Sequence, residues 1–143
     1  MYIMAGICLL IQGIWDIRTK EIPMWISLCL GGCGFLYSVY IQREWISILL
    51  SLLPGAACLM IGVITRQAIG YGDGILITAL GMLYSVDELL EICIIAIFFA
   101  CAAGLILLIF FKKKGNYEIP FVPFLFVGWM IVYIMHWAGR QVI

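Results

Sequence analysis

Charge is what this sequence has least of. Only 11% of its 143 residues are charged and 66% are hydrophobic, whereas about a quarter of the residues in a soluble domain are charged. Basic and acidic residues are equal in number, so the net charge is zero and gives no bulk attraction to nucleic acid. Water cannot be the solvent for most of this surface, and the composition indicates a protein embedded in a lipid bilayer.

The sequence also has no cysteine pair in a C-x-x-C arrangement. Its six cysteines all lie in apolar segments, where we expect them to act as small buried hydrophobic groups: Cys8, Cys29, Cys33, Cys58, Cys93 and Cys101. Neither a zinc site nor a disulfide framework has support, and we expect no metal and no cofactor. The amino-terminal segment lacks a basic region and a small-residue cleavage site, so we interpret it as a retained span and not a signal peptide.

What the chain does have is six apolar segments joined by short connections. Each is near the roughly 20 residues that a helix needs to cross the hydrocarbon layer. The segments are residues 2–17, 23–41, 45–65, 68–86, 89–111 and 119–138. They predict an all-α, polytopic membrane protein with about six transmembrane helices, forming a single membrane-embedded domain over residues 1–143.

The basic residues predict how these spans are oriented. The loops after the first, third and fifth spans share one side and carry six of them: Arg18, Lys20, Arg66, Lys112, Lys113 and Lys114. The other side carries the remaining two, Arg43 and Arg140. Because cytoplasmic loops are enriched in Lys and Arg, we expect the first group to face the cytoplasm and both termini to lie outside the plasma membrane.

This topology brings two aspartates to one membrane level, although 57 positions separate them in sequence. Asp16 ends the first span, and Asp73 lies near the start of the fourth, between Gly72 and Gly74. Extending the fourth helix back to Ala68 would put Asp73 roughly 7 Å below the membrane boundary. An ionisable group at membrane depth is costly, so it marks a functional site by default.

Two such carboxylates can act together. A pair that shares one proton is the arrangement of aspartic proteases, in which the ionised member takes a proton from water and the protonated one polarises the carbonyl. Gly70, Gly72 and Gly74 would let another backbone come close or let the chain adopt unusual φ and ψ values. The alternative is that each aspartate caps a helix or faces lipid headgroups, which suits Asp73 at a helix start but not Asp16 at a helix end.

Three motifs resemble those of the type IV prepilin peptidases. Residues 16–23, DIRTKEIP, resemble the family's first-aspartate motif, and residues 70–73, GYGD, are similar to its G-x-G-D motif. Residues 119–125, IPFVPFL, followed by Gly128, resemble its I-P-F-x-P-F-L…G element. Met24 stands where the family commonly has asparagine and Ile75 where it often has lysine, differences that concern substrate preference and charge near the site.

The resemblance implies a membrane aspartic endopeptidase that removes short basic leader peptides from prepilins or prepilin-like proteins at the cytoplasmic face. Asp16 and Asp73 carry over as the catalytic pair, supported by the three glycines and by Pro23, Pro120 and Pro123. The family's larger members have an N-methylating region with paired C-x-x-C motifs. This chain has no such motifs, so the resemblance is to the short form with peptidase activity alone. The bilayer and the prepilin substrate are the expected partners.

Two other functions remain open from the residues themselves. Paired intramembrane carboxylates also bind protons or cations in small transporters, although both acids here lie at one end of the bundle. A non-catalytic scaffold for pilus or secretion assembly would keep the spans and tolerate loss of either aspartate.

Several further polar and aromatic residues are expected to be interfacial. Glu21 and Glu118 are interpreted as solvated cytoplasmic charges, and Glu91 as part of an outer acidic group. His136 is expected near the outer end of the last span, far from the aspartates. An aromatic belt at the span ends is predicted from Trp15, Trp25, Tyr40, Trp45, Tyr84 and Trp137.

Overall fold

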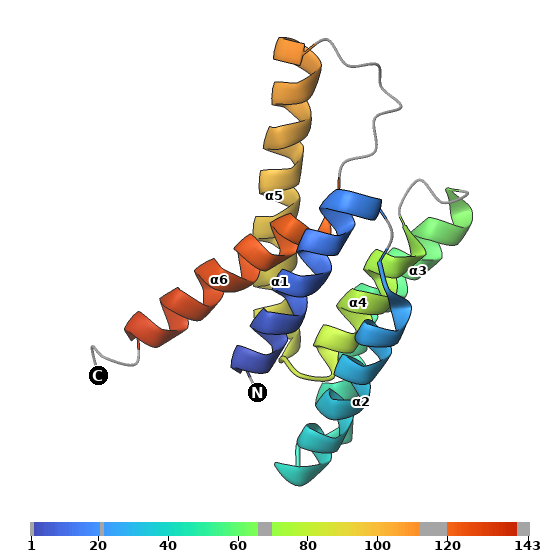
Figure 1. Cartoon of the computed structure of the whole chain (residues 1–143). Helices are drawn as coiled ribbons and strands as arrows, with labels where there is room; N and C mark the ends of the chain where they lie inside the picture. The colour runs from blue at the N-terminus through green and yellow to red at the C-terminus, as the bar shows by residue number, and fades with distance from the viewer. Residues whose placement is uncertain (1, 21, 66–69, 112–119, 140–143) are drawn as a thin grey trace.

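The structure is a computed structural model that describes residues 2–20, 22–65, 70–111 and 120–139. In these ranges the chain forms six helices, and the expected all-α, polytopic membrane fold is confirmed (Figure 1). The helices are α1 (Tyr2–Thr19), α2 (Met24–Tyr40), α3 (Trp45–Ile64), α4 (Tyr71–Gly81), α5 (Val86–Phe111) and α6 (Val122–Gly139).

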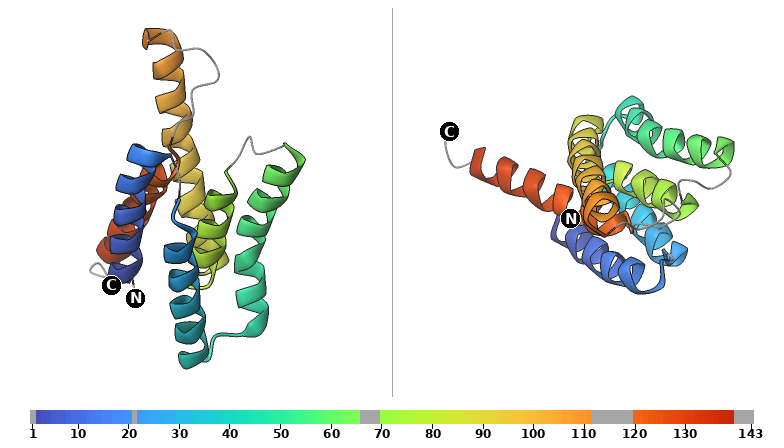
Figure 2. Two further views of the ribbon diagram at one scale, coloured as in Figure 1. Left: turned by 45° about the vertical axis from the view of Figure 1, so that its right-hand side comes forward. Right: turned by 90° about the horizontal axis from the view of Figure 1, so that it is seen from above.

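The helices pack as two groups that share a core. In one group α4 lies between α2 and α3, and in the other α6 packs against α1 and α5. Contacts of α5 with α3 and α4, and of α1 with α2, join the groups (Figure 2). The end of α1 and the starts of α2, α4 and α6 lie at one end of the bundle (Figure 1).

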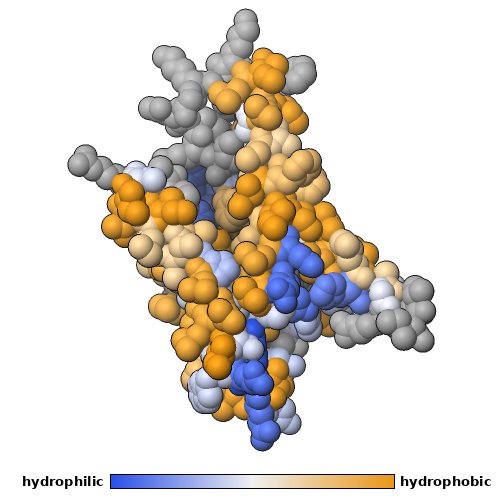
Figure 3. Space-filling model, turned by 180° about the vertical axis from the view of Figure 1, so that it is seen from behind, coloured by the Kyte–Doolittle hydropathy of each residue, from blue (hydrophilic) through white to orange (hydrophobic). Residues whose placement is uncertain are grey.

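Among the residues that the structure describes, three helices are long and apolar enough to cross a membrane. They are α3, residues Val86–Ile109 of α5, and α6, and α2 is a shorter apolar helix. Apolar residues cover most of the face in Figure 3, and hydrophilic residues gather mainly in its lower half. Large hydrophobic side chains such as Phe98 and Ile109 are about two-thirds exposed, which fits a surface solvated by lipid.

The fourth helix is shorter than predicted. The expected span of residues 68–86 is replaced by a helix that begins at Tyr71, because Gly70 is extended, with φ −62° and ψ 132°. Residues 66–69 lie outside the described residues. The helix ends at Gly81, and α5 begins at Val86, before the expected Leu89. Eleven helical residues rise only about 16 Å, roughly half of the hydrocarbon thickness.

A single arginine holds the turn between α4 and α5. The Arg43 guanidinium donates hydrogen bonds to the Tyr84 carbonyl at 2.8 Å and the Ser51 hydroxyl at 3.1 Å, with longer contacts to the carbonyls of Ser47 and Gly81. The Ser51 hydroxyl also donates to the Gly81 carbonyl at 2.7 Å. These donors satisfy carbonyls that a helix end leaves unpaired, so they stabilise the early end of α4.

The turn from α2 to α3 is stabilised by backbone hydrogen bonds. Gln42 has a positive φ of 56°, the Gln42 N–H donates to the Val39 carbonyl, and the Arg43 N–H donates to the Ser38 carbonyl. This is the Schellman arrangement that ends many helices. No described glycine has a positive φ. Of the two roles expected for the glycines around Asp73, close approach of another backbone is therefore the one that the structure shows, at Gly74 beside the Leu59 nitrogen.

The burial of one belt aromatic residue and of most cysteines differs from the prediction. Tyr84 is only 3% exposed and its hydroxyl accepts a 2.7 Å hydrogen bond from Trp129, so it belongs to the core. The other five aromatic residues assigned to a belt are more than half exposed. Among the cysteines only Cys93 is buried, whereas Cys29, Cys33 and Cys101 are exposed on outward helix faces, where lipid takes the place of a protein core.

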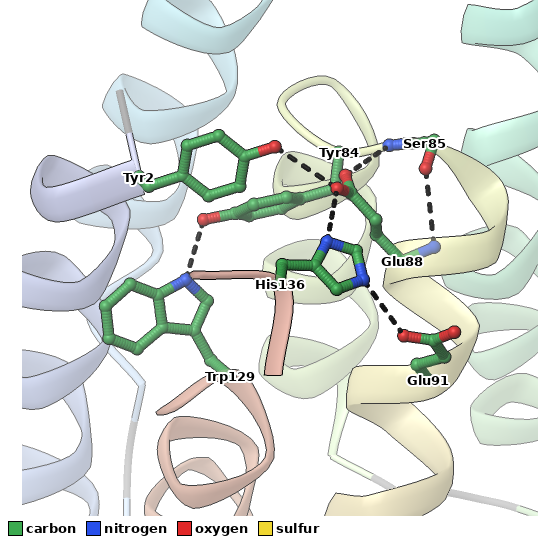
Figure 4. Close-up of polar contacts among 7 residues, drawn as sticks. All are labelled: Tyr2, Tyr84, Ser85, Glu88, Glu91, Trp129 and His136. Atoms are coloured by element: carbon green, nitrogen blue, oxygen red, sulfur yellow. Dashed lines mark hydrogen bonds and ion pairs between the residues drawn. The ribbon is translucent and has the colours of Figure 1, made fainter. Parts of the chain in front are cut away.

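A polar network lies at the end of the bundle that contains the start of α1. His136 lies 3.3 Å from Glu88 and 3.6 Å from Glu91, and the Tyr2 hydroxyl donates to Glu88 (Figure 4). A cavity of about 200 Å³ opens beside Tyr2 and Arg43 here. His136 follows Val122 by 14 residues of α6, about 20 Å of helix. His136 therefore lies far from the Asp16 end, as expected.

Candidate active site

Asp16 is buried at the junction of α1 and α6. It lies in the last turns of α1 and is 5% exposed, and its Oδ2 accepts a 3.1 Å hydrogen bond from the Val122 N–H. Val122 is the first residue of α6, so its N–H is one of those that a helix start leaves unpaired. The positive end of α6 thus accommodates an acid that the carboxyl end of α1 would disfavour.

Asp73 lies in the first turn of α4 with less support. Its Oδ1 is buried and has no hydrogen-bond partner among the described residues. Its Oδ2 lies over Gly70, where an added Cβ would stand 3.3 Å from this oxygen. Gly70 is the cap residue of α4 and makes no side-chain capping bond. Because Oδ1 has no partner among the described residues, the Asp73 carboxylate can still accept a hydrogen bond.

The fold brings these two carboxylates toward each other. The end of α1 and the start of α4 lie at the same end of the bundle (Figure 1), and the charge of Asp16 acts electrostatically on Asp73. Carboxyl groups at one end of a bundle can accept or donate a proton and can polarise water.

The glycines around Asp73 allow close packing. A Cβ on Gly72 would come 2.9 Å from Ile22, and a Cβ on Gly74 would come 2.7 Å from the Leu59 side chain and 3.2 Å from its backbone nitrogen. The absence of a side chain at Gly72 therefore lets the segment before α2 pack against α4. The absence of a side chain at Gly74 lets α3 pack against α4. Each contact fixes the position of the first turn of α4.

The three prolines lie at helix starts around the same end. Pro23 is the cap residue of α2, with φ −67°. Pro120 precedes α6, and Pro123 lies in its first turn. A Cβ on Gly13 of α1 would stand 3.5 Å from the Pro123 Cα, so α1 and α6 meet there in ordinary contact.

The first motif therefore contacts both of the others. The Asp16–Val122 hydrogen bond joins the first motif to the third, and the Ile22–Gly72 contact joins the first to the second. In the third motif, Gly128 lies against the backbone of α5, since an added Cβ would come 2.6 Å from the Ile92 carbonyl oxygen. Glu21, Glu118, Arg66 and the lysines at 112–114 lie outside the described residues.

Sequence reasoning missed two buried polar residues and one cysteine near the site. Gln12 and Ser27 are each 0% exposed and are joined by a 2.8 Å hydrogen bond. The available signal was the position of Gln12, four residues before Asp16 in an apolar helix. Cys58 of α3 interacts electrostatically with Asp73. Within the described ranges, no three His, Cys, Asp or Glu residues group together in a way that could hold a metal ion.

Comparison with known proteins gives one match. No curated protein and no solved structure matches the chain. Residues 3–109 match the type IV leader peptidase family. This range contains Asp16, Asp73 and the glycines around Asp73, and it ends before the third motif at residue 119. Because the match covers about three-quarters of the 143 residues, the chain belongs to the type IV leader peptidase family.

Proposed function

We propose that this peptidase is a membrane aspartic endopeptidase that removes basic leader peptides from type IV prepilins or prepilin-like proteins. The observation that supports the proposal is that Asp16 and Asp73, from helices distant in sequence, lie at the same end of the bundle, where the charge of Asp16 acts on Asp73. The family supplies the reaction class, and the pair supplies groups that can perform it.

The reaction would use the carboxyl groups in different protonation states. The ionised carboxylate accepts a proton from water while the water oxygen attacks the scissile carbonyl carbon, and the protonated carboxyl donates a hydrogen bond to the carbonyl oxygen. The tetrahedral intermediate then collapses, the C–N bond breaks, and the leaving amine takes the proton. Asp16, held by the Val122 N–H, is the more firmly oriented of the two acids.

The proposed cleavage takes place at the cytoplasmic face of the plasma membrane. The predicted excess of Lys and Arg on that side supports this orientation. A leader peptide rich in basic residues would meet two acidic groups there, and its apolar helix would stay in the bilayer.

The test replaces each acid by its amide. Asp16→Asn and Asp73→Asn nearly preserve shape and should each abolish cleavage of a co-expressed prepilin, by at least about 100-fold if each supplies general acid or base catalysis. The double variant should be hardly worse, because residues that act as a unit are non-additive.

Asp87→Asn is the matched control. Asp87 is an exposed acid in the first turn of α5, at the other end of the bundle, and this variant should cleave normally. Membrane levels of each variant are compared by immunoblot. Substantial processing by either single variant would exclude the aspartic mechanism and favour a non-catalytic scaffold.

A further inference from the structure

One buried amide beneath the candidate pair is only half satisfied. The Gln12 Nε2 donates to the Ser27 hydroxyl at 2.8 Å, and its Oε1 has no hydrogen-bond partner in the described part of the chain. Turning the amide over would let the hydroxyl donate to Oε1 and would leave Nε2 unpaired instead. One end of the Gln12 amide is therefore unpaired in either orientation.

Gln12 lies one helical turn before Asp16 on the buried face of α1. Residues four apart share a helix face, and the buried face of α1 runs from Ala5 through Leu9 and Gln12 to Asp16, each at most 5% exposed. On this face only Gln12 and Asp16 are polar. The amide thus lies one helical turn beneath the carboxylate, toward the interior.

An unpaired buried amide lowers the stability of the fold, so its presence points to a function. An apolar residue of the same size would avoid that loss of stability. Buried waters that make about three hydrogen bonds are the usual way to satisfy such groups. Asp73 Oδ1 is the other buried side-chain atom without a partner among the described residues, and one water has two protons to donate.

We propose that Gln12 is a positioning residue for the aspartate pair, with its amide anchored by Ser27 and its free end holding a buried water that hydrogen-bonds to the pair. The inference rests on the proposed function, because it assigns Gln12 a role in the same site. The water fixes the orientation of the carboxyl groups and is not the attacking water. Gln12 therefore affects the reaction through other groups and does not touch the substrate.

The test compares Gln12→Leu with the double variant Gln12→Leu/Ser27→Ala in the purified full chain. The substrate is a synthetic peptide with a basic leader, a glycine and the start of an apolar helix. We expect Gln12→Leu to lower kcat by about 10-fold or more, as for outer partners of other sites, with KM within about twofold. Its pH–rate profile should change, since that profile reports the acid and the base.

The double variant separates positioning from folding. Replacing both partners by apolar groups removes the cost of a half-satisfied pair, so stability should recover while kcat stays low. Recovery of kcat together with stability, or an unchanged pH profile in either variant, would overturn the inference. If Asp16→Asn and Asp73→Asn are inactive while Gln12→Leu equals wild type, only the inference fails. If the asparagine variants cleave, the proposed function fails, and the inference falls with it.

Discussion

Removing the Arg43 guanidinium should destabilise the fold without changing any residue of the candidate site. Arg43→Met keeps much of the side-chain volume and deletes the guanidinium that bonds Tyr84 at 2.8 Å and Ser51 at 3.1 Å. Hydrogen bonds to a charged group contribute about 1.5–3 kcal/mol each. Ser51 still donates to the Gly81 carbonyl, so we count only the two short bonds and expect a loss of about 3–6 kcal/mol.

This loss should appear as a lower unfolding temperature in detergent, by roughly 10–20 °C for a chain of this size. Far-UV circular dichroism of the purified protein follows the helices directly. Arg43→Lys should recover little of the lost stability, because one ammonium group cannot reproduce the several planar N–H donors of a guanidinium. Glu44→Gln, at an exposed neighbouring position, should leave the melting temperature unchanged. The reasoning would be refuted if Arg43→Met melted with the wild type.

Two further predictions concern packing and orientation. Gly74→Ala should lower stability by about 1–3 kcal/mol through overpacking, because its Cβ would meet Leu59 at 2.7 Å. Gly32→Ala, where an added Cβ meets nothing within 4 Å, should stabilise α2 by about 0.5–1 kcal/mol; equal thermal melts for the two variants would contradict this. In a variant without native cysteines, Tyr40→Cys should be labelled by an impermeant thiol reagent in sealed cells, and Arg66→Cys and Lys113→Cys only after permeabilisation. External labelling at position 66 or 113 would reverse the proposed orientation.

The number and class of the helices were predictable because apolar runs of this length have few other solutions in a bilayer. The bounds of α4 were not. Hydropathy continues through Leu83 and Tyr84, and the early helix end depends on Arg43, which approaches from a loop 38 residues earlier than Gly81. A contact of that kind leaves no periodic signal in the sequence.

The site was predictable to a different degree. The order of the spans predicted that Asp16 and Asp73 would lie at one end of the bundle, and the motifs singled out both residues, whose catalytic role stays a prediction. The sequence could not show that Asp16 bonds to the start of α6, since that pairing depends on how α1 and α6 cross. Gln12 was overlooked because a single glutamine in an apolar helix has many uses, and only its burial and its half-paired amide distinguish it.

The shortness of α4 has a consequence for the surrounding lipid. Arg43 bonds the carboxyl end of this helix to the α2–α3 loop, and the 11 residues of α4 rise only about 16 Å, roughly half of the hydrocarbon thickness. Hydrophobic mismatch of this kind is relieved by local thinning of the bilayer or by protein that encloses water. For the proposed function, we infer that the acids lie at the floor of a local depression in the membrane, where a leader junction would be hydrated while the apolar helix that follows it remains in lipid.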